Sequence, residues 1–472
     1  MRLRLSRQNI FTILSCLFLL SAAIAGWPTA STVAQSEYDT LKKMRDASKA
    51  ISNPDELAWQ QFAEINQRAV DDKCPDLSTG QQRNSDNPYE VCWERWADSG
   101  AKGNVYGDPK QASLEWPTPK HPQPFRPQRP ALDFLELKSA IQNLKLTDLA
   151  DHKLPKLPLI NKLNNDQRAT LLGKLQALLQ LEFVRGERKL SQEESMSIET
   201  FLNDAVSFVL EIEDQDEYEE IRMNRVAFDY VAGNGLWFVE GQREILRAGG
   251  SISFPLGSIE VKAEWKPICR QLSDDDCEKQ QEVYHSKIYK NEVWGLHALN
   301  MMYKSLPDWI WATWEHKNNL DRWKAPTLRD SFGYPFTAPQ VDRPSLGLIG
   351  LFDNAKVKLV NEWFSYRLNG TQTSFVDAND KPTLLGNSVI EHDILETSSC
   401  ITCHSEGVVD QFGHSSVRTL GRHKAPGWPD SERISNTCHL SLDFVLSLMN
   451  AKCKYYPQCV IPGKGAIPGC GE

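Results

Sequence analysis

The stretch Cys400-Ile401-Thr402-Cys403-His404 constrains this chain more than any other part of the sequence. Two cysteines separated by two residues can each form a thioether with a vinyl group of haem, and the next histidine then becomes the proximal iron ligand. Zinc sites and redox dithiols also use C-x-x-C, so the motif favours haem only in a chain that reaches an oxidising compartment. A zinc site needs a second ligand pair at matched spacing, and a thioredoxin-like dithiol needs a surrounding βαβ unit.

Residues 1–34 have the organisation of a secretory signal peptide. Three arginines stand among the first seven residues, and the run from Ile10 to Ile24 is almost entirely apolar. Small residues before position 35 indicate cleavage after Ala34, with Ala25 as the other candidate. Two alternatives stay open: an uncleaved anchor, because the apolar run approaches bilayer length, and lipid attachment at Cys16. We expect cleavage, a periplasmic or secreted protein, and no membrane attachment afterwards.

Cysteine usage agrees with export. Of the eleven cysteines, one lies in the leader and two belong to the motif, which leaves an even number suited to disulfides. Cys74 with Cys92 and Cys269 with Cys277 are natural local pairs. The other four allow three pairings that the sequence does not separate: Cys438, Cys453, Cys459 and Cys470.

The composition is that of an ordinary globular protein, with 40% hydrophobic and 24% charged residues. The formal net charge is −9, and loss of the leader makes it more negative because the leader carries three arginines and no acid. An acidic protein is poorly suited to nucleic acid or an anionic membrane as its main partner. It can dock to a basic redox partner protein, and a small-molecule substrate is also open.

We predict an α+β multidomain protein with a helical N-terminal half, a β-rich middle domain and a C-terminal haem segment. That last segment is expected to be mainly helix and loop, as in a cytochrome c. A run of seven prolines within 107–131 excludes helix and central strand there. The expected segments are a signal peptide at 1–34, helical regions at 35–106 and 132–225, a proline-rich connector at 107–131, the β-rich domain at 226–385 and the haem c-binding segment at 386–472.

Secondary structure within these segments follows from hydrophobic spacing. A helix is expected over 55–69, and the start of another at 387–391. Residues 441–450 have the spacing of a C-terminal helix, whereas 408–429 looks like loop. Strands are predicted where apolar and polar residues alternate or β-formers gather, at 226–231, 236–239, 257–265, 293–299, 309–316 and 361–368.

Several short blocks, some of them containing tryptophan, precede the motif in a recognisable order. They include Trp294-Gly295-Leu296-His297, the block from Pro307 to His316 that ends Ala-Thr-Trp-Glu-His, and Asn387-Ser388-Val389-Ile390-Glu391. With the C-x-x-C-H, these blocks resemble a group of exported bacterial cytochrome c family proteins, over roughly residues 226–450. The resemblance implies one covalent haem c and a periplasmic location, and it implies no assigned reaction. Trp314 is a departure, since phenylalanine is more usual at that position.

The sixth iron ligand decides between electron transfer and reactions at an open iron site. The candidates from the tryptophan-rich strands are His316 and His297, each of which is more often a core histidine. Met449, His414 and His423 follow the motif and are the other candidates. Asn436-Thr437-Cys438-His439 does not make a second haem site, because Ser435 occupies the place of the first cysteine.

Three hypotheses follow. The first is a periplasmic single-haem cytochrome that passes electrons, with the β-rich domain serving for docking or access. The second is a haem enzyme of peroxidase or oxygenase type, with His316 or His297 in the distal pocket and Glu315 as an acid–base group, although a solvated carboxylate is the more common role for such a residue. The third is a haem-bearing sensor or binding module. The chain length favours the second hypothesis, since a simple carrier needs only about 100 residues.

Overall fold

The computed structural model describes residues 42, 46–67, 91–118, 125, 171, 218–335, 343–354, 361–391, 394–411, 413, 415–417 and 438–454. The chain divides into two units, Met1–Lys49 and Ala50–Glu472. In the first unit, only residues 42 and 46–49 are described, and they are helical. The account below concerns the second unit. Within the described residues, none of the helices combines the length and apolar character that a membrane crossing requires.

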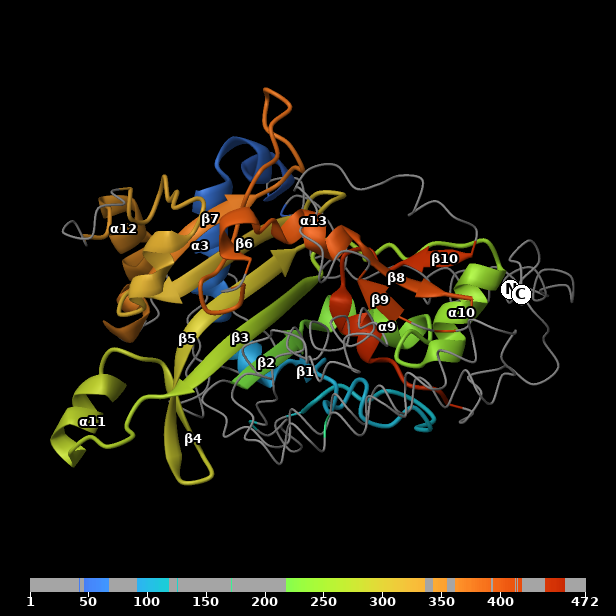
Figure 1. Ribbon diagram of the computed structural model, residues 1–472, viewed down its shortest axis with the longest axis horizontal. Helices are drawn as coiled ribbons and strands as arrows, with labels where there is room; N and C mark the ends of the chain where they lie inside the picture. The colour runs from blue at the N-terminus through green and yellow to red at the C-terminus, as the bar shows by residue number, and fades with distance from the viewer. Residues whose placement is uncertain are drawn as a thin grey trace, which may run out of the picture. The chain divides into compact units, whose positions relative to one another are not determined.

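A seven-stranded antiparallel sheet organises the second unit (Figure 1). Six strands follow the order β1-β2-β3-β5-β6-β7, and β4 pairs with β5 beside this path. Their bounds are β1 Ala97–Asp98, β2 Tyr218–Met223, β3 Ile259–Pro267, β4 Ser286–Tyr289, β5 Glu292–Tyr303, β6 Ile310–His316 and β7 Tyr366–Gln372. The chain is therefore a mixed α/β protein with a large antiparallel sheet, and the strands predicted at 257–265, 293–299 and 309–316 are confirmed.

The two faces of this sheet carry different cores. Alternate residues of β3, such as Val261 and Trp265, face a cluster that includes Trp59 and Phe62 of helix α3 (Pro54–Ile65). This helix packs on β6 and β7, and it confirms the helix predicted over 55–69. The opposite face, which includes Trp311 of β6, contributes to a second core with the motif residue Ile401.

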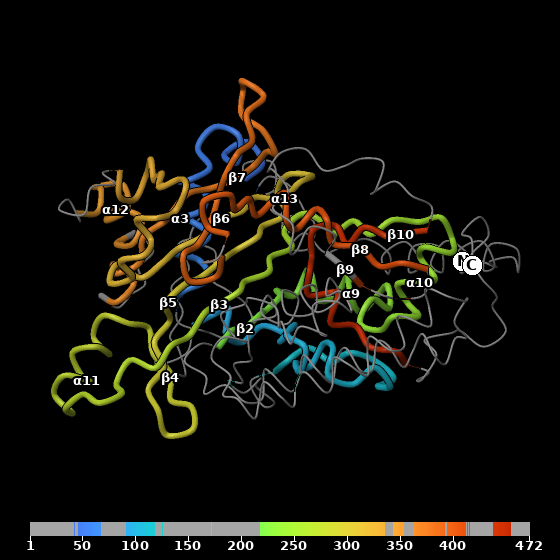
Figure 2. The backbone as a smooth tube through the Cα atoms, viewed as in Figure 1, coloured from blue at the N-terminus to red at the C-terminus, as the bar shows by residue number. Residues whose placement is uncertain are grey.

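A small sheet with the order β10-β8-β9 extends the second core. Its strands are β8 Gly407–Asp410, β9 Ser415–Val417 and β10 His439–Ser441. Helix α10 (Val239–Arg247) packs on β8 and β10, and the tube view shows the three side by side (Figure 2). The segment predicted as mainly helix and loop thus contains a sheet, because residues 408–410 pair with 439–441.

The remaining helices are short. They are α9 Arg225–Gly233, α11 Asp274–Gln281, α12 Leu346–Asn354 and α13 Cys400–Ser405, with the 3₁₀ helices η2 Cys92–Arg95, η3 Leu320–Lys324, η4 Asn361–Ser365, η5 Leu395–Thr397 and η6 Leu446–Asn450. The helix predicted over 441–450 is only η6, and the predicted helix start at 387–391 is a turn. The strand predicted over 361–368 begins at Tyr366, after η4.

Two predicted strands are wrong. Residues 226–231 belong to α9, and 236–239 lead into α10. The side chain of Asn224 accepts a hydrogen bond from the backbone N–H of Ala227, which starts α9 as an N-cap. Phe228 and Val231 are buried on one face of this helix, so their β-forming character serves helix packing. The sheet also takes β1 and β2 from outside 226–385, and the six predicted segment boundaries stay a prediction.

Candidate functional site

Helix α13 places Cys400, Cys403 and His404 together at the edge of the second core. Cys400 and Cys403 are three residues apart in this helix, so their side chains lie on one face. Gln372 of β7 holds the start of α13, because its side-chain oxygen accepts from the N–H of Ile401 at 2.9 Å. The amide nitrogen of Gln372 donates to the hydroxyl of Ser399 at 2.9 Å. A strand residue of the large sheet thus satisfies a backbone donor that every helix start leaves open.

The imidazole of His404 is oriented by the backbone of the C-terminal segment. Its Nδ1 lies 2.8 Å from the carbonyl oxygen of Phe444. A carbonyl only accepts, so Nδ1 carries the proton and the neutral ring has its lone pair on Nε2. Burial lowers the pKa of His404 to about 4, although the bond to Phe444 acts in the opposite direction. The ring is therefore neutral at pH 7, with Nε2 able to bind a metal.

A cluster of aromatic side chains lies on one side of this imidazole. The ring of Trp311 lies 4.5 Å from that of His404 at an interplanar angle of 56°. Phe444 lies 6.1 Å from Trp311 and 6.2 Å from Phe375, measured between ring centroids. Trp311 and Phe375 are buried in the second core, which Phe444 also contacts. Such surroundings suit a flat apolar cofactor whose iron is shielded from water.

The two motif cysteines are free thiols, whereas other described cysteines are oxidised. Cys269 and Cys277 form a disulfide with a Cα–Cα distance of 5.0 Å, which confirms that predicted pair. Cys92, Cys438 and Cys453 are also disulfide-bonded. Cys400 and Cys403 are not, and burial raises the pKa of Cys403 to about 12, with Glu391 and Glu406 adding to the effect. Both sulfurs are thus reduced and lie on one helix face beside His404, with Cys400 Sγ donating to the carbonyl of Leu385 at 3.5 Å.

These observations fit a covalently attached haem c. Cys400 and Cys403 would supply the thioethers and His404 the proximal nitrogen, with its tautomer already set by Phe444. Metal-binding histidines commonly donate their second N–H to a carbonyl in this way. Across the described ranges, no group of three His, Cys, Asp or Glu side chains converges to hold a bare metal ion.

Three residues near the site have a strained backbone conformation. Asp443 and Phe444 have positive φ angles of 48° and 70°, and Trp309 has one of 63°. This left-handed region is uncommon for residues other than glycine and unusual for bulky ones. Each such residue costs about 1–3 kcal/mol and persists only where its surroundings hold it. The carbonyl that orients His404 thus belongs to a turn that the fold keeps in place against a local preference.

His316 is not brought to the motif. Its Nε2 donates to the carbonyl of Val283 at 2.9 Å, and its Nδ1 accepts from the N–H of Asn318 at 3.2 Å. Its ring stacks on Tyr284 with centroids 3.5 Å apart. His316 lies five residues along β6 from Trp311, which corresponds to about 17 Å of strand. Both of its nitrogens have partners, so it is a core histidine.

His297 belongs to the same end of the sheet as His316. Its Nδ1 lies 3.3 Å from the carbonyl oxygen of Gly295, and its ring stacks on Tyr284 at 5.0 Å. Burial lowers its pKa to about 4. The structure therefore groups His297, Tyr284 and His316 with one another, at a distance from His404.

Glu315 is buried and hydrogen-bonded, and it is not the solvated carboxylate that is common at such a position. It is fully buried, and its carboxylate accepts from Asn369 at 2.6 Å, from the N–H and hydroxyl of Ser388 at 2.8 and 2.6 Å, and from Asn319. Asn387 donates to the hydroxyl of Thr313 at 2.7 Å. The Thr-Trp-Glu-His and Asn-Ser blocks thus form one network that fixes the loop leading to the motif.

The remaining candidates for the sixth iron ligand follow the motif in the sequence. Met449 lies in η6 and packs against the second core. His414 and His423 lie outside the described residues, as do Cys74, Cys459 and Cys470. The sixth ligand therefore stays a prediction.

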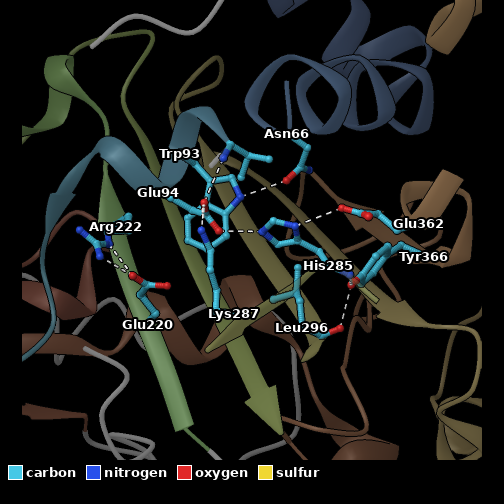
Figure 3. Close-up of polar contacts among 11 residues, drawn as sticks. Asn66, Trp93, Glu94, Glu220, Arg222, His285, Lys287, Leu296, Glu362 and Tyr366 are labelled. Carbon is cyan, nitrogen blue, oxygen red and sulfur yellow. Dashed lines mark hydrogen bonds and ion pairs between the residues drawn. The ribbon is translucent and has the colours of Figure 1, made fainter. Parts of the chain in front are cut away.

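A buried charged cluster was not anticipated from the sequence (Figure 3). His285 lies between two carboxylates, with Nε2 2.7 Å from Glu94 and Nδ1 3.2 Å from Glu362. Glu94 also pairs with Lys287 at 2.5 Å. Burial alone raises the pKa of Glu94, but Lys287 and His285 outweigh it and bring the value to about 2. The cluster fastens η2 to β4 and η4, and single charged residues in the sequence carried no signal of this convergence.

Comparison of the chain with protein-family models, with curated proteins and with solved structures finds no match. The site is therefore interpreted from its own geometry.

Proposed function

We propose that this chain is an exported c-type cytochrome that holds one haem through Cys400 and Cys403 and transfers single electrons. The observation that carries the proposal is the bond from His404 Nδ1 to the carbonyl of Phe444. It gives the last residue of the C-x-x-C-H motif the tautomer and orientation that a proximal ligand needs. When bound there, haem iron changes its charge by one unit and so carries one electron.

The residues around the motif have defined tasks in this proposal. Trp311 and Phe444 exclude water from the imidazole, and Gln372 fixes the start of α13 so that both sulfurs face one side. Glu315 and Asn387 hold the approach to the motif in one conformation. The acidic composition suits transient docking to a basic redox partner, which is also part of the proposal.

A simple carrier is favoured over a peroxidase-type enzyme by the contacts of the distal candidates. His316, His297 and Glu315 all have hydrogen-bond partners in the sheet or in the loops beside it, and His297 and His316 stack on Tyr284. Such a reaction needs an acid–base group at the open side of the iron, and the contacts of these three residues support structural roles for them instead.

The test is production in a host that attaches haem in its periplasm, followed by denaturation. We expect pigment that stays with the unfolded polypeptide and a reduced spectrum of c-type haem. The double variant Cys400→Ser/Cys403→Ser loses the covalent pigment, whereas Cys269→Ser/Cys277→Ser, which also removes two sulfurs, keeps it. A colourless wild-type chain with two titratable thiols contradicts the proposal.

Carbon monoxide then separates the two types of cytochrome. A reduced protein whose spectrum ignores carbon monoxide has both axial positions filled, as an electron carrier requires. If Met449 fills the sixth position, Met449→Leu opens the iron to carbon monoxide. A wild-type protein that binds carbon monoxide and reacts with peroxide instead supports the enzyme hypothesis.

A further inference from the structure

Two separate segments contact His404, and each is positioned by the loop next to it. The turn between β5 and β6 leads to Trp311, whose indole N–H donates to the carbonyl of Asp308 at 3.1 Å. The segment after β10 supplies the carbonyl of Phe444. The orientation of the imidazole therefore depends on how these two loops are held relative to each other.

Lys304 joins the two loops through one ammonium group. Its Nζ donates to the carbonyl of Pro307 at 2.7 Å and to the carboxylate of Asp443 at 2.8 and 3.0 Å. The side chains of Lys304 and Asp443 are only 6% and 10% exposed. Each ammonium proton thus has an acceptor, and Asp443, the partner of Lys304, is the residue next to Phe444.

The two ends of this ion pair are themselves fixed. The backbone of Lys304 pairs with Ser258 and Gly257 at 2.9 and 2.8 Å. Asp443 also accepts from the N–H of Phe254 at 2.7 Å. The ammonium lies 5.1 Å from the centre of the Trp309 ring, a cation–π contact. Asp443, Phe444 and Trp309 are the three residues near the site with left-handed backbone, so the pair braces the strained positions.

We propose that Lys304 and Asp443 are positioning residues for His404, and that their ion pair sets the reduction potential of the haem by holding the Phe444 carbonyl against Nδ1. This inference rests on the proposed function. A firmly held Nδ1–H···O bond makes the imidazole a more basic ligand and so stabilises the oxidised iron. Loosening the brace weakens that bond and raises the potential.

The direction of the shift separates positioning from simple charge. If Lys304 and Asp443 act only through their charges, Lys304→Met lowers the potential and Asp443→Asn raises it. If they act through His404, both single variants raise it, and so does the double variant Lys304→Met/Asp443→Asn, which leaves the net charge unchanged. We expect upward shifts of up to tenfold in the reduction equilibrium, or about 59 mV for a one-electron couple.

Redox titration of the pigmented proteins is the measurement, together with paramagnetic NMR of the haem methyl groups, which reports the orientation of the axial imidazole. Lys287→Met is the matched control, because it removes a partly buried lysine that pairs with Glu94 in a different part of the fold, and it leaves both readouts unchanged. Lys304→Arg, which can still donate to Asp443 and Pro307, stays close to wild type.

Where Lys304→Met does not accumulate as folded protein, Asp443→Glu keeps the charge, lengthens the side chain by one methylene and must still raise the potential. Shifts of opposite sign in the two single variants, or no shift in the double variant, overturn the inference. Absence of pigment in the wild type contradicts the proposed function instead, so the two failures are distinguishable.

Discussion

The Nδ1 atom of His404 lies 2.8 Å from the carbonyl oxygen of Phe444, although the two residues are 40 positions apart in the chain. The segment that supplies the carbonyl starts with β10, which pairs with β8 directly after α13. The small sheet therefore turns the C-terminal segment back over the motif. Its register decides which carbonyl reaches the imidazole, so the proximal ligand and the C-terminal strand are parts of one arrangement.

The first prediction concerns Trp311, which is 4% exposed and contacts the ring of His404. Trp311→Ala should lower the free energy of unfolding by about 3–5 kcal/mol. It should also lower the reduction potential, because water that reaches the imidazole favours the more highly charged oxidised iron. Thermal unfolding and redox titration measure the two effects. Trp363→Phe, at a buried residue that stacks on His285, should affect stability alone. An unchanged potential in Trp311→Ala contradicts the assigned shielding.

A second prediction concerns the carboxylate of Glu315, which accepts hydrogen bonds from three side chains and one backbone N–H. In Glu315→Gln, one of the two carboxylate oxygens becomes an NH₂ group, which cannot accept a hydrogen bond in either orientation of the amide. The donors on that side lose their acceptor, and we expect the free energy of unfolding to fall by about 1–3 kcal/mol. Urea unfolding should show this loss, while covalent pigment is retained. Glu278→Gln on the exposed face of α11 should change stability by no more than about 0.5 kcal/mol. If Glu315→Gln leaves the stability unchanged but alters the reaction with peroxide, Glu315 acts as an acid–base group instead.

The central strands could be predicted because apolar and polar residues alternate along them. In β3, Val261 and Trp265 face one core while Lys262 faces the other side, which is the period of two that a sheet imposes. β2 has no such signal. Glu220 and Arg222 are both buried and pair with each other, so a charged sequence occupies the interior of the sheet. The burial of these two residues can be recognised only in the folded structure, where their ion pair is seen.

In α9, the sequence predicts a strand where the structure has a helix. Four of its nine residues are β-branched or aromatic, and these favour a strand. The N-cap at Asn224 and the burial of Phe228 and Val231 on one side stabilise a helix instead of a strand. Propensity is a weak preference that packing overrides, and here it was overridden by a helix against the second core.

At the site, the motif fixed the identity of three residues but not their surroundings. Phe444 takes part through its backbone carbonyl, a role that no side-chain pattern announces. His316 and His297 were attractive because they lie in the tryptophan-rich blocks. Strand register instead places them beside each other and beside Tyr284. The blocks support the motif by folding the loop before it, through Glu315 and Asn387.

A third prediction concerns the buried charged cluster. Glu94→Gln leaves the buried His285 and the partly buried Lys287 without their shared anion, and breaking a buried pair costs about 3–5 kcal/mol. Urea unfolding at pH 7 measures the loss. Glu292→Gln breaks an ion pair with Arg270 in which both side chains are 38% exposed, and it should cost about 1 kcal/mol or less. Equal losses in the two variants would mean that burial does not strengthen the contribution of Glu94.

The last prediction is the pH dependence that the same carboxylate confers. Folding lowers the pKa of Glu94 from 4.5 to about 2. A carboxylate with a depressed folded-state pKa contributes stability that is fully present above pH 4.5 and is lost as the pH falls towards 2. The difference corresponds to about 3 kcal/mol. Urea unfolding at several pH values between 5 and 2 should therefore show a steeper loss of stability in the wild type than in Glu94→Gln. Glu278→Gln should keep the wild-type slope, because Glu278 is exposed. If Glu94→Gln and wild type lose stability in parallel over this range, the acid sensitivity belongs to other carboxylates and the pairing of Glu94 with Lys287 and His285 does not control it.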